Sequence, residues 1–403
     1  MADTRTATSD VVVIGGGVIG AAIAYFATVE GLGVTVLERD LPANGTSSAC
    51  EGNILISDKE LGPELELARY SLDVWNDDLA EHAHLWEFES KGGIIVASKP
   101  SSLESLNRLT DTQRGYGVDA QDLSIDQLRD LEPHISPDAL GAAFYPEDSQ
   151  VQPMLVAAHL LRLARRRGAR VVTGAQVTGV LREGEKVTGV RTGVGDFSAG
   201  AVVNAAGTWA SSVAELAGVR VPVLPRRGFV MVTEPMRPMV HHKVYAAEYV
   251  DNVGSSDAGL QASPVIEGTP AGSILIGSSR ERIGFDRTVS VPALATIARN
   301  AVALFPFLDQ AKVLRHYHGF RPYCPDHLPV IGHDDRAPGL WHAAGHEGAG
   351  IGLSAGTGKL MAQALAGREP EIPLGAFAPH RFGTLSRSAE AGPSTHATAE
   401  EAQ

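Results

Sequence analysis

Three glycines near the amino terminus, Gly15, Gly17 and Gly20, have the spacing G-x-G-x-x-G and follow an apolar run over residues 11–14. In a strand–turn–helix unit the first glycine permits a tight turn, and the second lets a phosphate approach the backbone. The third lets helix and strand pack closely. A helix expected over residues 21–29 would point its amino-terminal N–H groups at a pyrophosphate. The spacing therefore predicts a nucleotide-binding turn.

A second apolar run, residues 34–37, follows that helix and ends at Glu38. A carboxylate in this position accepts hydrogen bonds from ribose hydroxyls and repels a 2′-phosphate, which argues against NADP. Strand, glycines, helix, second strand and acid occur in this order within about 30 residues, as a βαβ unit requires. The segment therefore predicts a bound dinucleotide, either NAD or FAD.

The composition is that of a globular enzyme, with 403 residues of which 44% are hydrophobic and 20% are charged. This length suggests two domains. A net charge of −13 argues against a nucleic-acid partner. Cys50 and Cys324 give neither a disulfide framework nor a metal-ligand pattern, so we expect core thiols and no metal. We find no signal segment and no run of about 18 apolar residues, and we expect a cytoplasmic location with no transmembrane segment.

The chain leaves the nucleotide-binding pattern and later returns to it. We expect a loop over 40–56, helices over 62–90 and 101–132, another helix from Pro153, and a strand-rich segment over 219–290. This order predicts an α/β (α+β two-domain) fold, in which a Rossmann-like domain carries an inserted antiparallel β-rich substrate domain. The expected boundaries are a disordered tail over 1–9, a nucleotide-binding domain over 10–90 with 150–218 and 330–385, a substrate domain over 91–149 with 219–329, and a disordered tail over 386–403.

Motifs in four parts of the chain carry a resemblance to a known family. In order they are "VVVIGGGVIG" with "VLER" and "GTSSACEGN", then "VVNAAGTWA", then "GFRPYCPDHLPVIG", and finally "AAGHEGAGIGLSAGTG". Together they resemble the D-amino-acid oxidase superfamily, in its glycine oxidase, sarcosine oxidase and amino-acid dehydrogenase branch, over about residues 10–370. The resemblance implies a GR2-type domain that binds FAD rather than NAD.

The late glycine-rich segment agrees with a flavin on physical grounds. A reduced flavin carries negative charge near N1 and O2 and needs fixed donors there, and the helix that follows the glycines would supply its amino-terminal N–H groups. The alternative is that these glycines only allow close helix packing. Related enzymes that attach their flavin covalently use a cysteine where this chain has Gly319, so we expect non-covalent FAD.

The resemblance also implies which residues contact FAD, from the pyrophosphate to the pyrimidine side of the flavin. Glu38 would bind the adenosine ribose, and Arg39 would lie beside the adenine. The other expected cofactor-binding residues are Gly15, Gly17, Val18, Ile19, Gly20, Thr46, Ser47, Ser48, Gly52, Asn53, Val177, Ala206, Gly207, Gly348, Gly350, Ile351 and Gly352.

Two residues are candidates for the substrate side. Arg321 in "GFRP" matches the arginine that binds the substrate carboxylate in family members acting on amino acids, and a planar guanidinium suits a carboxylate. The alternative is an arginine that caps a surface turn. His346 is either a pocket residue or a structural hydrogen-bonding group. Leu260 and Gly348 stand where glycine-oxidase-like sequences carry a tyrosine and an arginine, so the pocket should differ from one built for glycine.

The resemblance implies an FAD-dependent amino acid or amine dehydrogenase or oxidase. Hydride would pass from the carbon bearing nitrogen to flavin N5, and water would hydrolyse the imine. The expected substrate is a D-amino, N-alkyl or opine-like amino acid. One alternative is a 2-hydroxy acid dehydrogenase, and another is the catalytic flavin subunit of a heteromeric dehydrogenase.

The electron acceptor would be O₂, a quinone or a partner subunit. Sarcosine-oxidase-like sequences place a lysine before an Ile-Gly pair to promote the reaction with oxygen. Here Leu275 precedes Ile276 and Gly277, so no charge is available at that position. Leu275 therefore favours a dehydrogenase over an oxidase.

Overall fold

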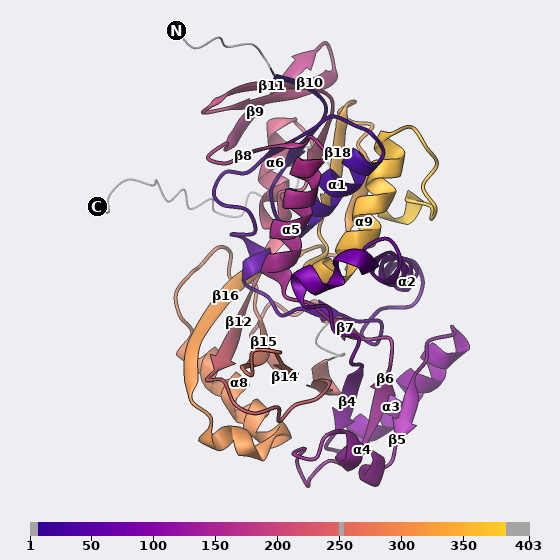
Figure 1. The fold of residues 1–403 in the computed structure, drawn as a ribbon, viewed down its shortest axis with the longest axis vertical. Helices are drawn as coiled ribbons and strands as arrows, with labels where there is room; N and C mark the ends of the chain where they lie inside the picture. Colours follow the sequence, from indigo (N-terminus) through magenta and orange to yellow (C-terminus); the bar gives the residue numbers. More distant parts are fainter. Residues whose placement is uncertain (1–6, 250–253, 384–403) are drawn as a thin grey trace.

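The structure is a computed structural model that describes residues 7–249 and 254–383. It is built around two β-sheets, one in the upper and one in the lower part of Figure 1. Residues 1–6 of the first predicted tail lie outside the described residues, and so does the whole of the second predicted tail, 386–403. Residues 7–9 were expected in the first tail, but they begin strand β1 and pair with residues 197–199.

The first sheet is mainly parallel and contains the predicted βαβ unit. Its strand order is β17-β18-β11-β1-β2-β8, and β10 and β9 continue from β11 as antiparallel strands. The apolar run of β1 is buried, as expected for a strand covered on both faces. The strands are β1 (Ala7–Ile14), β2 (Val34–Leu37), β8 (Arg170–Val172), β9 (Val177–Glu183), β10 (Lys186–Thr192), β11 (Gly195–Asn204), β17 (Val330–His333) and β18 (Leu340–Ala344).

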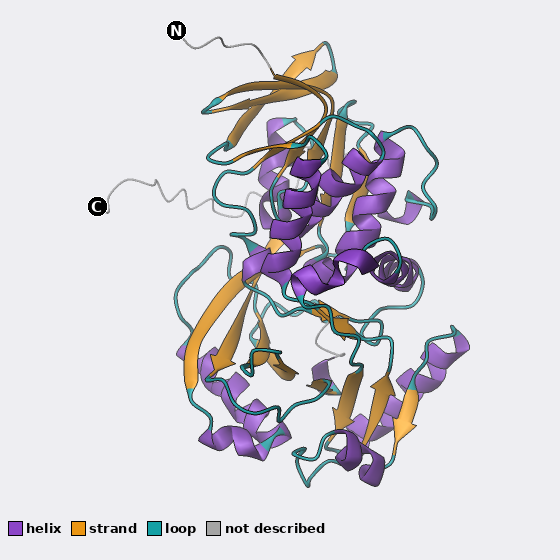
Figure 2. Cartoon of the chain, viewed as in Figure 1, coloured by secondary structure: helices purple, strands orange, loops and turns teal. Residues whose placement is uncertain are grey.

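Helices pack beside this sheet in the upper part of Figure 2. Helix α1 (Val18–Val29) lies between α5 (Pro153–Arg166) and α9 (Gly350–Leu365), and α9 also contacts α2 (Pro63–Asn76). A Cβ atom at Gly358 would lie 2.7 Å from the Cβ of Ala22, so this glycine allows α9 to approach α1 closely. The last helix beside this sheet is α6 (Ala210–Leu216).

The second sheet is mainly antiparallel and has the order β16-β12-β15-β14-β13-β4-β6-β5, with β13 and β4 parallel. Helices α3 (Pro100–Gly115), α4 (Ile125–Leu131) and α8 (Val291–Leu304) pack against it. Its strands are β4 (Gly93–Ala97), β5 (Gln121–Leu123), β6 (Gly141–Tyr145), β12 (Leu224–Thr233), β13 (Lys243–Ala246), β14 (Gln261–Gly268), β15 (Ile274–Arg280) and β16 (Val313–Tyr323).

Three segments differ in detail from the secondary structure that the sequence predicts. The helix predicted over 62–90 ends at Asn76 and is followed by the 3₁₀ segment η2 (Ala80–Trp86). The helix predicted over 101–132 is α3 and α4 with β5 between them, because Gly117 at φ 79° ends one and Ser124 caps the next in a capping box.

The loop predicted over 40–56 contains two short elements. They are the 3₁₀ turn η1 (Thr46–Ser48) and strand β3 (Asn53–Ile54), which pairs with β7 (Ser149–Gln150). The remaining 3₁₀ segments are η3 (Gly207–Trp209), η4 (Pro306–Gln310), η5 (Glu347–Ala349), η6 (Gly375–Phe377) and η7 (Pro379–Phe382).

Candidate active site

A cavity of about 530 Å³ lies at the carboxyl ends of the strands of the first sheet and reaches β16 of the second. Its volume is within the range of about 300–1,000 Å³ that is usual for small-molecule sites. The predicted site residues that line it are Gly15, Gly17, Val18, Ile19, Glu38, Arg39, Thr46, Ser47, Asn53, Val177, Ala206, Gly207, Arg321, His346, Gly348, Gly350 and Ile351. The fold thus brings both predicted substrate residues to the predicted nucleotide site.

Four predicted contact residues do not line this cavity and have packing roles instead. A Cβ atom at Gly20 would overlap the carbonyl oxygen of Gly15, and one at Gly52 would overlap that of Val151. The Ser48 hydroxyl donates to the carbonyl oxygen of Gly45 at 3.1 Å. The Gly352 carbonyl accepts hydrogen bonds from the Ser71 hydroxyl and the Trp75 indole.

The first turn of helix α1 forms one wall of the cavity. Gly17 is the N-cap and supplies no side chain to the free N–H groups, and the Val18 N–H donates to the Ser47 hydroxyl at 3.0 Å. A Cβ atom at Gly17 would lie 3.3 Å from that hydroxyl. The helix end therefore presents backbone donors and positive dipole charge, which suit a phosphate.

Glu38 is anchored beside this turn. Its carboxylate accepts from the Gly16 N–H at 2.7 Å and from the Asp40 N–H at 2.9 Å. The neighbouring Arg39 guanidinium lies 3.9 Å from the centre of the Trp209 ring, and both side chains line the cavity. Because each carboxylate oxygen can accept a further hydrogen bond, Glu38 still has the capacity to bind ribose hydroxyls.

His346 and the start of helix α9 form the opposite wall. The N-cap of α9, Ala349, has no side chain that could bond the free N–H groups, so this helix also offers donors to a bound anion. The Nε2 atom of His346 lies 3.1 Å from the Thr357 hydroxyl. Burial lowers the pKa of His346 to about 3, so the imidazole is neutral at physiological pH.

Arg321 extends from β16 into the part of the cavity next to the second sheet. Its Nη1 atom donates to the Ser279 carbonyl at 2.8 Å, which fixes the guanidinium while leaving other N–H groups free. A Cβ atom at Gly228 would overlap this guanidinium, and one at Gly348 would lie 3.7 Å from its Nε atom. Desolvation lowers the pKa of Arg321, as expected for a cation without an anionic partner at hydrogen-bond distance.

Sequence reasoning missed several lining residues, among them Glu51, Trp209 and Tyr249. Glu51 lies in "GTSSACEGN", a motif that the resemblance already quoted, so that motif could have indicated it. Trp209 likewise lies in a quoted motif, "VVNAAGTWA". Tyr249 lies in none of them, and its place in the site depends on contacts between distant segments. Burial raises the pKa of Glu51 to about 7.

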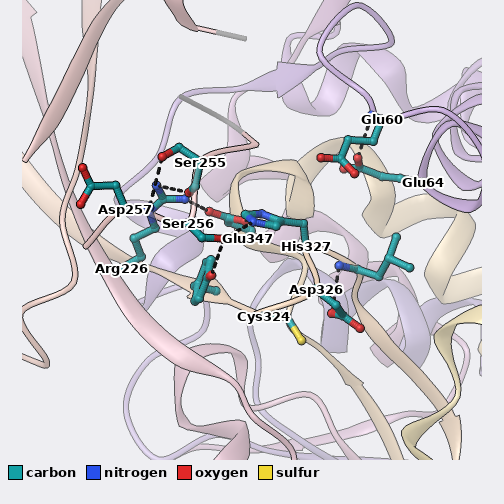
Figure 3. Close-up of polar contacts among 12 residues, drawn as sticks. Glu60, Glu64, Arg226, Ser255, Ser256, Asp257, Cys324, Asp326, His327 and Glu347 are labelled. Atoms are coloured by element: carbon teal, nitrogen blue, oxygen red, sulfur yellow. Dashed lines mark hydrogen bonds and ion pairs between the residues drawn. The ribbon is translucent and has the colours of Figure 1, made fainter. Parts of the chain in front are cut away.

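Glu347 borders both the large cavity and an adjoining small cavity of about 20 Å³. Figure 3 shows that its carboxylate is held between Arg226 and His327. Arg226 also donates to the Ser255 carbonyl and to the Gln261 side chain. Because these partners already neutralise it, Glu347 supports the start of α9 rather than offering a free charge to a ligand.

The two cysteines and the possible metal ligands add no further chemistry to this site. Cys324 is fully buried and does not line the cavity, whereas Cys50 lines it, and burial raises the pKa of each thiol to about 12. Within residues 7–249 and 254–383 no cluster of side chains could hold a metal ion.

The residues present fit a flavin dinucleotide. Two uncapped helix ends border the cavity, one at the glycine turn of α1 and one at the start of α9, and Glu38 and a neutral His346 also line it. The family model of the FAD-dependent oxidoreductases named DAO matches residues 10–364.

This chain belongs to the DAO family of FAD-dependent oxidoreductases.

Relatives in this family cover nearly the whole chain. The hydrogen cyanide synthase subunit HcnC of Pseudomonas aeruginosa is 29% identical over 91% of this chain and 94% of that protein. The glycine oxidase of Geobacillus kaustophilus is 30% identical over 91% of this chain and 96% of its own length. The crystal structure of that glycine oxidase matches with a TM-score of 0.84 over 96% of this chain and 100% of that chain, at 27% identity.

A further solved structure supports the fold alone. The L-proline dehydrogenase from P. horikoshii matches with a TM-score of 0.85 over 94% of this chain and 98% of that chain, at 22% identity. Membership of the DAO family confirms the predicted fold class and the predicted cofactor, FAD. No helix in the described ranges 7–249 and 254–383 has both the length and the apolar character needed to cross a bilayer.

Proposed function

We propose that this DAO-family enzyme oxidises the carbon–nitrogen bond of an amino acid or a secondary amine that carries a carboxylate. The observation that carries the proposal is Arg321, which enters the cofactor cavity with free guanidinium donors and no anionic side chain at hydrogen-bond distance in the described residues. Relatives named glycine oxidase and sarcosine dehydrogenase support the same class of reaction.

In this proposal the first sheet and its helices form the FAD-binding domain, with residues 10–90, 150–218 and 330–385. The second sheet forms the substrate domain, with residues 91–149 and 219–329. The backbone at Gly15, Gly17, Val18 and Ile19 would bind the pyrophosphate without a covalent link, and Glu38 would bind the ribose. Gly348, Gly350 and Ile351 would hold the flavin.

FAD, when bound, supplies the acceptor for the hydride that leaves the substrate carbon. Arg321 pairs with the substrate carboxylate in two parallel hydrogen bonds and so fixes the orientation of the reacting carbon. His346 remains neutral at physiological pH and adds no charge next to the reacting group. The residues of this chain therefore position the substrate, and the imine is hydrolysed by water.

We infer a dehydrogenase rather than an oxidase as the finer assignment. Leu275 places no charge beside Ile276 and Gly277, and the buried Lys243 is ion-paired with Glu267. A relative named as a subunit, HcnC, supports a role as the catalytic flavin subunit of a larger enzyme. A quinone or a partner subunit then takes the electrons in preference to O₂.

An anaerobic substrate screen tests the proposed function. The purified protein should be yellow and should release FAD on denaturation. D-amino acids, N-methyl amino acids, opines and matching 2-hydroxy acids are mixed with it in turn while the flavin absorbance is recorded. Bleaching by at least one amine, and not by the matching hydroxy acid, supports the proposal; bleaching by hydroxy acids alone contradicts it.

A further inference from the structure

A second charged side chain reaches the cavity near Arg321 and has no role in the function proposed above. Glu51 lies between η1 and β3, lines the same cavity as Arg321, and has a relative exposure of only 6%. Its Oε1 atom has no hydrogen-bond partner in the part of the chain that the structure describes. Because a buried acceptor without a donor costs free energy, a carboxylate that borders a ligand cavity with no donor of its own points to a donor on the ligand.

The carboxylate of Glu51 packs against the second sheet. A Cβ atom at Gly277 of β15 would overlap the Glu51 carboxylate, with 2.5 Å to its Cδ atom. Gly277 in turn pairs with Val265 of β14. The carboxylate therefore occupies a space between segments far apart in the sequence, which only a glycine at position 277 leaves open.

The charges around Glu51 come from several elements. The surrounding charged and titratable groups are Lys243 of β13, Glu267 of β14, Arg280 of β15, Arg321 and Tyr317 of β16, and Cys50 and Tyr249. Lys243 is already ion-paired with Glu267, and Arg321 donates to the Ser279 carbonyl. Arg280 is buried as well, and its Nε and Nη1 atoms have no partner in the described residues. No hydrogen bond joins Glu51 to Lys243, Arg280 or Arg321 in this part of the chain, so the carboxylate can accept a hydrogen bond from a ligand.

Glu51 is suited to exchange a proton at neutral pH. Burial raises its pKa to about 7, and it raises the pKa of both Cys50 and Tyr249 to about 12. The arginines stay protonated. A carboxyl group with a pKa near the working pH can accept a proton and later release it.

We propose that Glu51 is a catalytic residue that binds the amino group of the substrate and accepts its proton. In this step a substrate N–H bond breaks and a Glu51 O–H bond forms, so the ammonium becomes a neutral amine and the carboxylate becomes a neutral acid. The nitrogen lone pair is then free to assist hydride loss from the adjacent carbon. Arg321 binds the carboxylate of the same molecule, and Glu51 thereby selects an amino acid over a 2-hydroxy acid. This inference rests on the proposed function.

The first test measures binding rather than turnover, with two unreactive ligands of the same shape. 2-Aminoisobutyrate has an amino group but no α-hydrogen, and pivalate has a methyl group in place of the amine. Binding is followed at pH 8 by the change in the flavin spectrum of the FAD-loaded protein. In the wild type 2-aminoisobutyrate should bind more tightly than pivalate, and Glu51→Gln should weaken its binding by at least about tenfold while pivalate binding stays unchanged.

The second test follows the rate of anaerobic flavin reduction against pH with a substrate found in the screen. For the wild type the rate should rise through an apparent pKa near 7 and then level off. Glu51→Gln should lower the rate at pH 7 by about 100-fold and move the rise toward the pKa of the free amine. Glu51→Asp, which keeps the carboxylate, should retain the low apparent pKa, and it also serves if the glutamine variant does not fold.

Glu66 is a matched control, because it is an exposed glutamate of α2 that lines neither cavity. Glu66→Gln should leave both ligand affinities and the pH profile unchanged. If Glu51→Gln keeps the wild-type pH profile, or if 2-aminoisobutyrate binds the wild type no more tightly than pivalate, the role of Glu51 is wrong. If no amine reduces the wild-type flavin, the proposed function itself fails.

Discussion

Arg321 and His346 border one cavity but differ in charge. Arg321 is a cation whose free N–H groups lack an anionic partner, whereas desolvation keeps His346 neutral. The sequence motif indicated Arg321, and this residue lines the cavity. The alternative that His346 is structural gains support from its contact with Thr357, although the side chain still borders the cavity.

At Arg321 we predict a specific loss of substrate binding. Arg321→Ala should cost about 2–5 kcal/mol in binding a carboxylate substrate, because the partner charge is left unpaired, while FAD remains bound. Steady-state kinetics and the flavin content of the purified variant measure the two effects. Arg282→Ala is the control, since Arg282 lies shortly after Ser279, the residue that Arg321 contacts, but lines neither cavity. A wild-type Michaelis constant in Arg321→Ala would place the carboxylate elsewhere.

We predict that His346 makes the folded protein less stable at acidic pH. The folded-state pKa is lowered to about 3 from an ordinary value of 6.5, so between these values the unfolded chain binds a proton that the folded chain does not. Stability therefore falls as pH drops below 6.5, by up to about 1.4 kcal/mol per pH unit.

His346→Gln should remove this contribution, which amounts to about 2 kcal/mol between pH 7 and pH 5. Urea unfolding of both FAD-saturated proteins at the two pH values measures it. If the variant loses as much stability between pH 7 and pH 5 as the wild type, His346 is not buried in its neutral form.

At the scale of elements, the β1–α1 turn uses its glycines for different purposes. A Cβ atom at Gly15 would lie 2.5 Å from the Ala205 carbonyl oxygen at φ 110°, and one at Gly20 would overlap the backbone. Gly17 has φ −74° and faces the cavity, where only the Ser47 hydroxyl is near. Gly17 therefore leaves space for the cofactor, whereas Gly15 and Gly20 are required by the fold itself.

This difference gives a paired prediction. Gly17→Val should yield a folded protein that is purified without FAD, because the side chain fills the space for the phosphate. Gly20→Val should lower the thermal unfolding midpoint of the FAD-free protein, whereas Gly17→Val should leave that midpoint close to the wild-type value. Stoichiometric FAD in Gly17→Val would show that the pyrophosphate binds elsewhere.

The βαβ unit and its site residues could be predicted because local spacing determines them. Apolar runs and glycines within a short segment specify strand, turn and helix, and the later motifs indicated Arg321 and His346 through their place in the family. Trp75 and Trp86 are both fully buried in the segment over 62–90 that was predicted to be helical. Apolar spacing could not show that α2 ends at Asn76, because the 3₁₀ segment η2 also buries Trp86.

Features that depend on distant segments could not be predicted in this way. Strand β5 is only three residues long and exists through its pairing with β6. Glu51 is a site candidate because Gly277 leaves room for its carboxylate, and this contact has no local signature. Gly356 and Gly358 belong to the glycine-rich motif but pack against Ser71 and Ala22, while Gly348 and Gly350 line the cavity, so the motif contains glycines of both kinds.

At the scale of the whole molecule, the cavity joins the two sheets, with the nucleotide-binding turn on the first and Arg321 on the second. The charges near the second sheet influence which electron acceptor the reduced flavin uses. Leu275 is uncharged, and the positive charge of Lys243 is balanced by Glu267. Position 275 therefore supplies no cation of the kind that promotes the reaction with oxygen in sarcosine-oxidase-like sequences, which favours a slow reaction with O₂.

We therefore predict that the reduced enzyme transfers electrons to a quinone or an artificial dye faster than to O₂. Stopped-flow mixing of the substrate-reduced protein with each acceptor gives the two rates. Reoxidation in air-saturated buffer as fast as turnover, with one hydrogen peroxide per flavin, would identify an oxidase and contradict the argument from Leu275.

The central claim is that hydride leaves the carbon that bears nitrogen, and one measurement tests it most directly. The amino acid that bleaches the flavin in the screen is prepared with deuterium at that carbon, and flavin reduction is followed without oxygen. The account predicts slower bleaching with the deuterated substrate and one keto acid or aldehyde, with one amine or ammonia, for each flavin reduced. Bleaching at an unchanged rate, without release of a carbonyl product, would contradict the account.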